Sequence, residues 1–304
     1  VRWWYRLTWP FYIVSFILLI IVEVMGHIGM GAQRWINLGF IQVQPSELMK
    51  IAVVMALARY FHSAGPDEMK RLTRLIVPGL IVAAPVGLVL LQPDLGTSLM
   101  MVMEAAAMVF IAGAPIWIFI AGFALAAVAV PIGWQFMHDY QKKRIFTFLN
   151  PESDPLGSGY HITQSKIALG SGGLQGKGFL QGTQSKLNFL PEKQTDFIFT
   201  LWSEEWGFLG GIAVLAIFGL VFCYGLWIAT RVRHNYGRYL ALGLMINFSL
   251  YVFINVAMVM GMIPAVGEPL PLISYGGTVM LSCMFAFGLI MSCNVHRDSK
   301  VTRV

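Results

Sequence analysis

Long apolar runs separated by short polar stretches dominate this chain. Eight such segments are each about long enough to cross a membrane as a helix, the second and fourth only marginally. They lie near residues 9–25, 45–62, 73–92, 95–113, 114–136, 207–230, 239–264 and 274–294. A membrane-spanning helix satisfies its own backbone hydrogen bonds, so the pattern predicts an all-α polytopic membrane protein of about eight transmembrane helices.

Composition excludes the soluble class. The 304 residues are 57% hydrophobic and only 12% charged, whereas soluble domains average about 25% charged residues. The three cysteines form no CxxC pair, so neither a disulfide framework nor a metal knuckle is indicated.

The basic residues orient the predicted helices. With a cytoplasmic N-terminus, the short outer connections carry only Arg34, and Lys50 stands just inside a helix. Most other basic residues then face the cytoplasm: Arg2, Arg6, Arg59, Lys70, Arg71, Arg74, Arg231, Arg233, Arg238, Arg297, Lys300 and Arg303. This positive-inside pattern explains the net charge of +6 without nucleic-acid binding.

Residues 137–206 form the long polar interruption, and we expect them to be one large extracytoplasmic loop of a single transmembrane domain, 1–304. Its glycine-rich passage GSGGLQGKGFLQGTQ, residues 170–184, resembles a nucleotide loop but fails that pattern. Ser171 replaces the first glycine, and Gly178 follows Lys177 where Ser or Thr is needed. Two interpretations stay open: a flexible loop at the membrane surface whose amides approach a ligand, or a structured re-entrant lobe.

Carboxylates beside membrane segments are costly and therefore point to chemistry. Glu47 and Lys50 of QPSELMK share one helix face, either as an interfacial ion pair or as part of a site. Asp94 of LQPDLGTSL is placed to cap the following helix. Glu104 is the clear mid-membrane carboxylate, and Asp196 of QTDFIF stands where a polar segment turns apolar.

The last outer turn, GMIPAVGEPLPLISYGGTVML, is bent by three prolines and Gly267 and leads through Ser274 into the final helix. Small residues there permit either close helix packing or an exposed helix N-terminus that attracts anions.

Together, QPSELMK, LLQPDLGTSL, the stretch from GYHITQSKIALGSGG to QTDFIF, and IPAVGEPLPLISYGG closely resemble the SEDS family of peptidoglycan glycosyltransferases. GKGFLQGTQSKLNFLPE and VGEPLPLISYGG resemble its rod-shape elongation (RodA) branch more than its division branch. Members have ten membrane helices. The resemblance therefore implies that this chain, which begins at Val1, lacks the first two.

The resemblance implies polymerisation of lipid II on the outer side of the cytoplasmic membrane, with Asp196 as the catalytic residue. A carboxylate there can take the proton of the attacking sugar hydroxyl as general base. Glu47 and Lys50 are implied to line the same cavity. A single displacement at an α-linked donor makes the reaction inverting.

The lipid diphosphate that leaves needs its charge stabilised. We favour Lys50 and count Lys193, Arg144, Asp94 and Ser274 among the substrate-binding residues. The family analogy also suggests a divalent cation, magnesium or manganese, although no ligand set is legible in the sequence.

Two residues depart from the family pattern: Gln194 replaces the usual His before TDF, and Asn188 replaces an acidic residue. Because position 188 carries no carboxylate, a mechanism that uses a second carboxylate eight residues before Asp196 is less well supported. Asp196 itself is present.

The implied partners are a class B penicillin-binding protein, which is a transpeptidase, and membrane proteins of the elongation complex. Two alternatives remain. The first is a lipid II flippase, for which Glu104 at mid-membrane is the best supporting feature. The second is a scaffold that only anchors the transpeptidase, which would need none of the charged residues.

Overall fold

The computed structural model describes residues 1–25, 27–29, 32–37, 39, 42–64, 68–136, 139–151, 158–183 and 194–299. The chain forms two compact units. Unit 1 comprises residues 1–125, 222–248 and 277–304, and unit 2 comprises residues 126–221 and 249–276.

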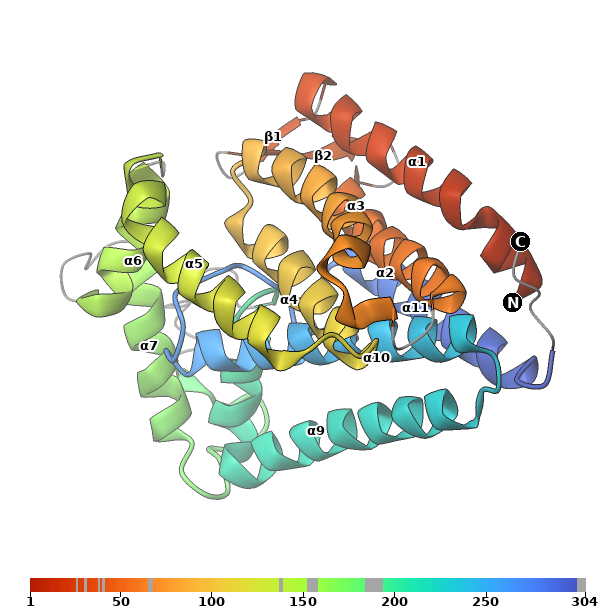
Figure 1. The fold of residues 1–304 in the computed structure, drawn as a ribbon. Coiled ribbons are helices and arrows are strands. Elements are labelled where there is room, and N and C mark those ends of the chain that lie inside the picture. The colour runs from red at the N-terminus through yellow and green to blue at the C-terminus, as the bar shows by residue number, and fades with distance from the viewer. Residues whose placement is uncertain are drawn as a thin grey trace. The chain divides into compact units, whose positions relative to one another are not determined.

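Unit 1 is built around the helix α2 (Pro45–Ser63), which is buried along most of its length. It contacts α1 (Arg2–Met25), α3 (Leu72–Leu91), α4 (Leu95–Ile111) and α11 (Gly277–Val295) (Figure 1). Pro45 begins α2 because its fixed φ suits the first helical turn and its missing N–H is not needed there. Neighbouring helices surround α2, so it can carry polar side chains that lipid would not solvate.

A small antiparallel sheet lies in the connection between α1 and α2, where the sequence analysis predicted no strand. It consists of β1 (His27–Gly29), β2 (Ala32–Asn37) and β3 (Gln42–Val43), in that order. Strands this short contain too few residues for an alternation of apolar and polar side chains to predict them from the sequence. Arg34 on β2 ties the sheet to the α3–α4 connection by donating to the carbonyls of Gln92 and Pro93.

Each of the eight predicted apolar segments corresponds to one helix, which confirms the predicted fold class. Some predicted ends lie outside the helix, as residues 260–264 do beyond the helix that ends at Val259. Within the described residues, α1, α3, α9 (Ile198–Arg231), α10 (Asn235–Val259) and α11 are long and apolar enough to cross a membrane. The apolar helices α4 and residues 116–129 of α5 (Ile116–Phe136) are shorter. The protein is therefore a multi-pass membrane protein.

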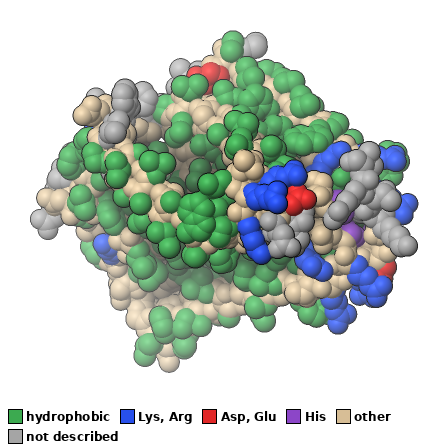
Figure 2. All heavy atoms as spheres, viewed as in Figure 1, with side chains coloured by type: hydrophobic (Ala, Val, Ile, Leu, Met, Phe, Trp, Pro, Cys, Tyr) green, Lys and Arg blue, Asp and Glu red, His purple; other side chains and the backbone are tan. Residues whose placement is uncertain are grey.

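Basic side chains gather at the end of unit 1 where α1 begins and α11 ends, as Figure 2 shows. Several of these basic residues form hydrogen bonds with backbone carbonyls at this end. Arg59 donates to the carbonyl of Tyr5, and the backbone N–H of Arg233 donates to the carbonyl of Arg297. This gathering is what the positive-inside interpretation of the sequence predicts.

Unit 2 contains α6 (Asp139–Leu149) and α7 (Ser158–Ser171), which pack against each other. It also contains the start of α9, which is broken at Gly207 (φ 67°). The predicted span began at this residue, but the preceding residues 198–206, which we placed in the loop, are also helical.

The break in α9 is held by residues 172–180, which we call the glycine loop. Its carbonyls at Gly173 and Leu174 accept the N–H groups of Phe208 and Leu209 after the break. A side chain at Gly207 would collide with the backbone of Leu174 and Gly176, so only glycine permits this approach. Trp202 bridges the break by donating to the carbonyl of Gly210 at 2.8 Å.

His234 makes the stability of unit 1 dependent on pH. Burial lowers its pKa from 6.5 to about 4, and positive charge on His62 acts in the same direction. Between these two pH values the unfolded chain binds a proton that the folded chain does not. We therefore expect the free energy of unfolding to fall by about 2–3 kcal/mol as the pH drops from 6.5 to 4, and to be unaffected above this window.

Melting temperatures of the detergent-solubilised protein across this range measure the effect. The matched variant is His234→Asn, because Asn can still accept the N–H of Gly237, which Nδ1 of His234 accepts at 2.9 Å. An equally steep loss of stability in this variant would contradict the assignment.

Candidate active site

Asp196 lies in a turn, residues 194–197, directly before α9, and it is half-buried. Three successive carbonyl groups of this turn accept hydrogen bonds. Tyr275 N–H donates to Gln194 at 2.8 Å, Ser274 Oγ donates to Thr195 at 2.5 Å, and Asn255 Nδ2 donates to Asp196 at 2.9 Å. The backbone that carries the carboxylate is therefore fixed at three consecutive residues.

Asn255 joins this turn to the last outer turn. Its fully buried amide also donates to the carbonyl of Glu268 at 2.8 Å. Because both acceptors are carbonyl oxygens, the NH2 end of the amide must face them. Asn255 therefore holds the backbone of Asp196 and of Glu268 together.

Gly267 (φ 82°) lies beside the carboxylate, because a methyl group at its α-carbon would stand 3.5 Å from Oδ2 of Asp196. The structure thus brings together TDFIF and VGEPLPLISYGG, two motifs about 70 residues apart in the chain. Ser274, predicted to bind substrate, accepts the N–H of Leu270 and donates to Thr195. In this structure it braces the turn that carries Asp196.

Basic side chains border the same outer turn. Arg144 on α6 is exposed and donates to the carbonyl of Val266 at 3.4 Å, and the side chain of Lys166 lies against Gly261. Positive charge therefore stands close to the residues that flank the Asp196 carboxylate. Lys193, predicted to bind substrate, lies outside the described residues, as does Asn188.

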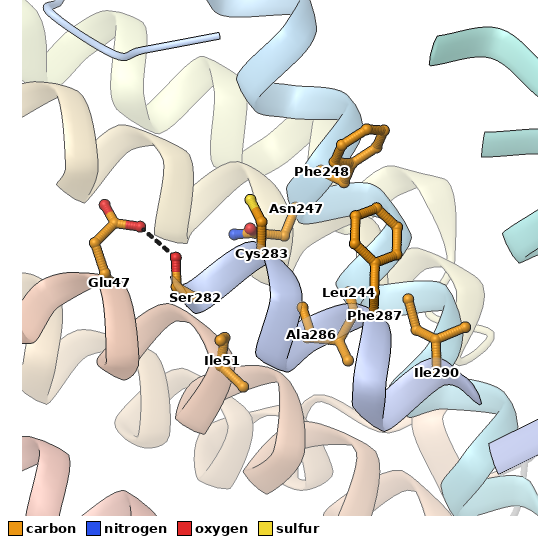
Figure 3. A pocket seen from close by; sticks show the side chains of 10 residues that line it. All are labelled: Glu47, Ile51, Leu244, Asn247, Phe248, Ser282, Cys283, Ala286, Phe287 and Ile290. Carbon is orange, nitrogen blue, oxygen red and sulfur yellow. Dashed lines mark hydrogen bonds between the residues drawn. The ribbon is translucent and has the colours of Figure 1, made fainter. Parts of the chain in front are cut away.

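In unit 1, Glu47 and Lys50 form an ion pair of 2.8 Å, and their side chains are only 2% and 1% exposed. Ser282 Oγ of α11 also donates to Glu47 at 3.3 Å. Glu47 and Ser282 line one end of a pocket with Asn247, while aromatic and aliphatic side chains line the rest (Figure 3). The pair is buried within unit 1, whereas Asp196 belongs to unit 2. An interfacial anchoring role and a role in a substrate site both stay predictions.

Asp94 fulfils the predicted capping role. Its carboxylate accepts the N–H of Thr97 at 3.2 Å and the hydroxyl of Thr97 at 2.9 Å, at the start of α4. It also pairs with Arg34 at 3.6 Å. These contacts account for its position without a ligand, and a contact with substrate stays a prediction.

Glu104 is fully buried and accepts a hydrogen bond of 3.1 Å from Asn247, which links α4 to α10. Its other oxygen, Oε1, has no hydrogen-bond partner among the described residues. The contact gives Glu104 a role in joining helices.

The glycine-rich passage matches the structured-lobe interpretation. Lys177 pairs with Glu204 at 2.7 Å, and the same carboxylate accepts the N–H of Thr183 at 2.9 Å. Glu204 is fully buried.

Among the described residues, no group of three His, Cys, Asp or Glu side chains lies close enough to hold a metal ion. The described side chains therefore do not supply a ligand set for the cation that the family analogy suggests. We derive no step through a metal, and the cation stays a prediction.

Sequence reasoning missed Asn255. The signal was present as a single amide within the apolar run YVFINVAMV. Polar side chains inside membrane helices usually have a specific hydrogen-bond partner. The sequence alone does not show that the partners of Asn255 are the carbonyl groups of Asp196 and Glu268.

Comparison with known proteins indicates one family over nearly the whole chain. The profile of the FtsW/RodA/SpoVE family, described as "Cell cycle protein", matches residues 1–299. Peptidoglycan glycosyltransferase MrdB of Escherichia coli strain K12 is 47% identical over 292 residues, which cover 94% of this chain and 77% of MrdB. Peptidoglycan glycosyltransferase RodA of Treponema pallidum strain Nichols is 35% identical, covering 92% of this chain and 81% of RodA.

The fold is similar to a solved structure as well. A chain described under "Structural coordination of polymerization and crosslinking by a peptidoglycan synthase complex" superposes with a TM-score of 0.84 at 30% identity. The superposition covers 98% of this chain and 84% of the other.

Proposed function

The chain belongs to the FtsW/RodA/SpoVE family, and from this premise we propose that it is a peptidoglycan glycosyltransferase that polymerises lipid II during cell elongation. The observation that carries the proposal is the braced turn of Asp196. Three hydrogen bonds to backbone carbonyls hold the turn that carries this half-buried carboxylate, and exposed basic residues lie nearby.

In the proposed reaction, the Asp196 carboxylate takes the proton of the attacking sugar hydroxyl as its oxygen forms a bond to the anomeric carbon of the donor. The bond from that carbon to the lipid diphosphate breaks, and the diphosphate leaves with the electron pair. This single displacement inverts the anomeric configuration. Asp196 ends protonated, and its proton returns to solvent.

Arg144 is the described basic residue best placed to stabilise the leaving diphosphate, because it contacts the turn that borders Asp196. The predicted threading turns the basic residues of the short connections towards the cytoplasm and puts residues 137–206 outside, so we propose that Asp196 lies on the extracytoplasmic side. That location suits a substrate carried by a lipid.

We further propose a transpeptidase partner, since the structural relative takes part in polymerisation and crosslinking.

The test is to incubate the purified chain, with a transpeptidase partner of the elongation type, with labelled lipid II in detergent. Glycan polymer resolved by gel electrophoresis is the expected product. Absence of polymer, together with movement of lipid II between the leaflets of vesicles, would establish a flippase instead.

Asn255 gives a second prediction about the same site. Replacing it with Ala removes both donors to the backbone of Asp196 and Glu268. We expect kcat to fall about 10- to 100-fold with KM little changed, because a small displacement of a catalytic group costs this much. Single-turnover rates with labelled lipid II measure it.

Asn255→Asp gives a sharper readout, because its protonated form can donate one hydrogen bond and its ionised form repels both carbonyls. Its rate relative to wild type is expected to fall as the pH rises, whereas that of Asn255→Ala stays constant. The matched control is Ser165→Ala, which removes buried hydrogen bonds to Thr200 and Val259 in the same unit. Equal losses of rate in Ser165→Ala and Asn255→Ala would show a merely structural role.

A further inference from the structure

The glycine loop, residues 172–180, exposes large apolar side chains although it lies outside the predicted spans. Leu174 is 70% exposed, Phe179 is 68% exposed and Leu180 is 63% exposed. Three such side chains within seven residues form a surface that is costly to leave in water.

The loop also carries no unpaired charge. Its one charged residue, Lys177, pairs with the fully buried Glu204 at 2.7 Å and donates to Thr183 at 2.8 Å. Gln175 is exposed but neutral. Neutralisation of Lys177 removes the largest cost of placing this segment in a medium of low dielectric constant.

Backbone hydrogen bonds fix the position of the glycine loop along the axis of α9. Leu174 accepts the N–H of Leu209, and Gly173 accepts that of Phe208. These two partners are each 60% exposed and lie in the first turn after the break at Gly207, at the start of the predicted span 207–230. Leu174 therefore stands level with the first turn of a membrane-spanning helix.

Two tryptophans lie at the same position along α9 as the glycine loop. Trp202 and Trp206 lie just before the break, are partly exposed, and stack with ring centroids 5.6 Å apart. Tryptophan is enriched where the bilayer meets water, because its ring is apolar and its N–H is polar. The loop thus adjoins both the apolar surface of α9 and an interfacial aromatic pair.

We propose that the glycine loop is a membrane-inserted element whose Leu174, Phe179 and Leu180 contact lipid acyl chains at the N-terminal end of the α9 span. The occupant of this apolar surface is the bilayer, because the surface continues directly into the lipid-facing surface of α9. Gln175 and the paired Lys177 place the loop in the outer part of that leaflet, near the headgroups. The inference concerns membrane contact and is independent of the proposed polymerase activity.

The test is a spin label at Phe179→Cys in the full chain, reconstituted into nanodiscs of phosphatidylethanolamine and phosphatidylglycerol. The native cysteines are first replaced as Cys223→Ser, Cys283→Ala and Cys293→Ala. Collision rates with oxygen, which concentrates in lipid, and with a water-soluble nickel chelate are then compared. Reference labels stand at Leu220→Cys on the exposed face of α9 and at Lys143→Cys on the exposed face of α6.

We expect the ratio of oxygen to nickel collisions at residue 179 to approach that at residue 220 and to exceed that at residue 143 several-fold. A ratio like that at residue 143 would place the loop in water. Low collision rates with both reagents would show that protein covers it, and either result overturns the proposal. A label at Leu174→Cys gives the same reading if Phe179→Cys melts at a lower temperature than its background.

Discussion

Asp196→Asn is expected to lower the rate of lipid II polymerisation by about 10²- to 10⁴-fold, the usual contribution of a positioned general base. The amide keeps the shape of the carboxylate but cannot accept the hydroxyl proton. Tyr275, Ser274 and Asn255 hold the turn through its backbone carbonyl oxygens, which the substitution leaves unchanged, so the variant should fold normally. Polymer yield and melting temperature, measured on the same preparation, separate chemistry from stability.

The control is Asp298→Asn, the same change at an exposed carboxylate that pairs with Arg233 in the other unit. It should polymerise at the wild-type rate. Wild-type activity in Asp196→Asn would remove this residue from the mechanism, and the family assignment would still stand on the similarity of the whole chain.

Lys50→Met is expected to lower the free energy of unfolding by about 3–5 kcal/mol, because it leaves the Glu47 carboxylate buried without its ion-pair partner. The methionine matches the length of the lysine stem, so packing against the neighbouring helices is retained. Thermal unfolding in detergent, followed by tryptophan fluorescence, measures the loss.

Adding Glu47→Gln to this variant should restore most of the stability, because a neutral amide is far less costly to bury than an unpaired carboxylate. A double variant as unstable as Lys50→Met would show that the loss comes from packing. Activity need not return with stability, since the resemblance places both residues in the substrate cavity.

The apolar pattern predicted the helices well because a membrane-spanning segment is specified by its own length and hydrophobicity. It also predicted a span that begins near residue 207, where the polar segment ends, but it did not predict that a helix precedes this residue. The pattern did not reveal the strands of residues 27–43 or the helix of residues 198–206. These segments are short and are stabilised by contacts with distant residues, such as Arg34 with the α3–α4 connection.

The amino-acid pattern was sufficient to predict a multi-pass helical membrane protein of one recognisable family, and it singled out Asp196 and the Glu47–Lys50 pair. Those features are local, since they depend on runs of apolar residues and on short motifs. Three further features required the folded structure: Asn255 and Ser274 brace the turn of Asp196, Glu204 is buried and paired with Lys177, and the glycine loop is hydrogen-bonded to residues 208 and 209 of α9. Each of these contacts joins residues far apart in the chain, and a linear pattern carries no information about which distant groups become neighbours when backbone and side-chain hydrogen bonds are satisfied.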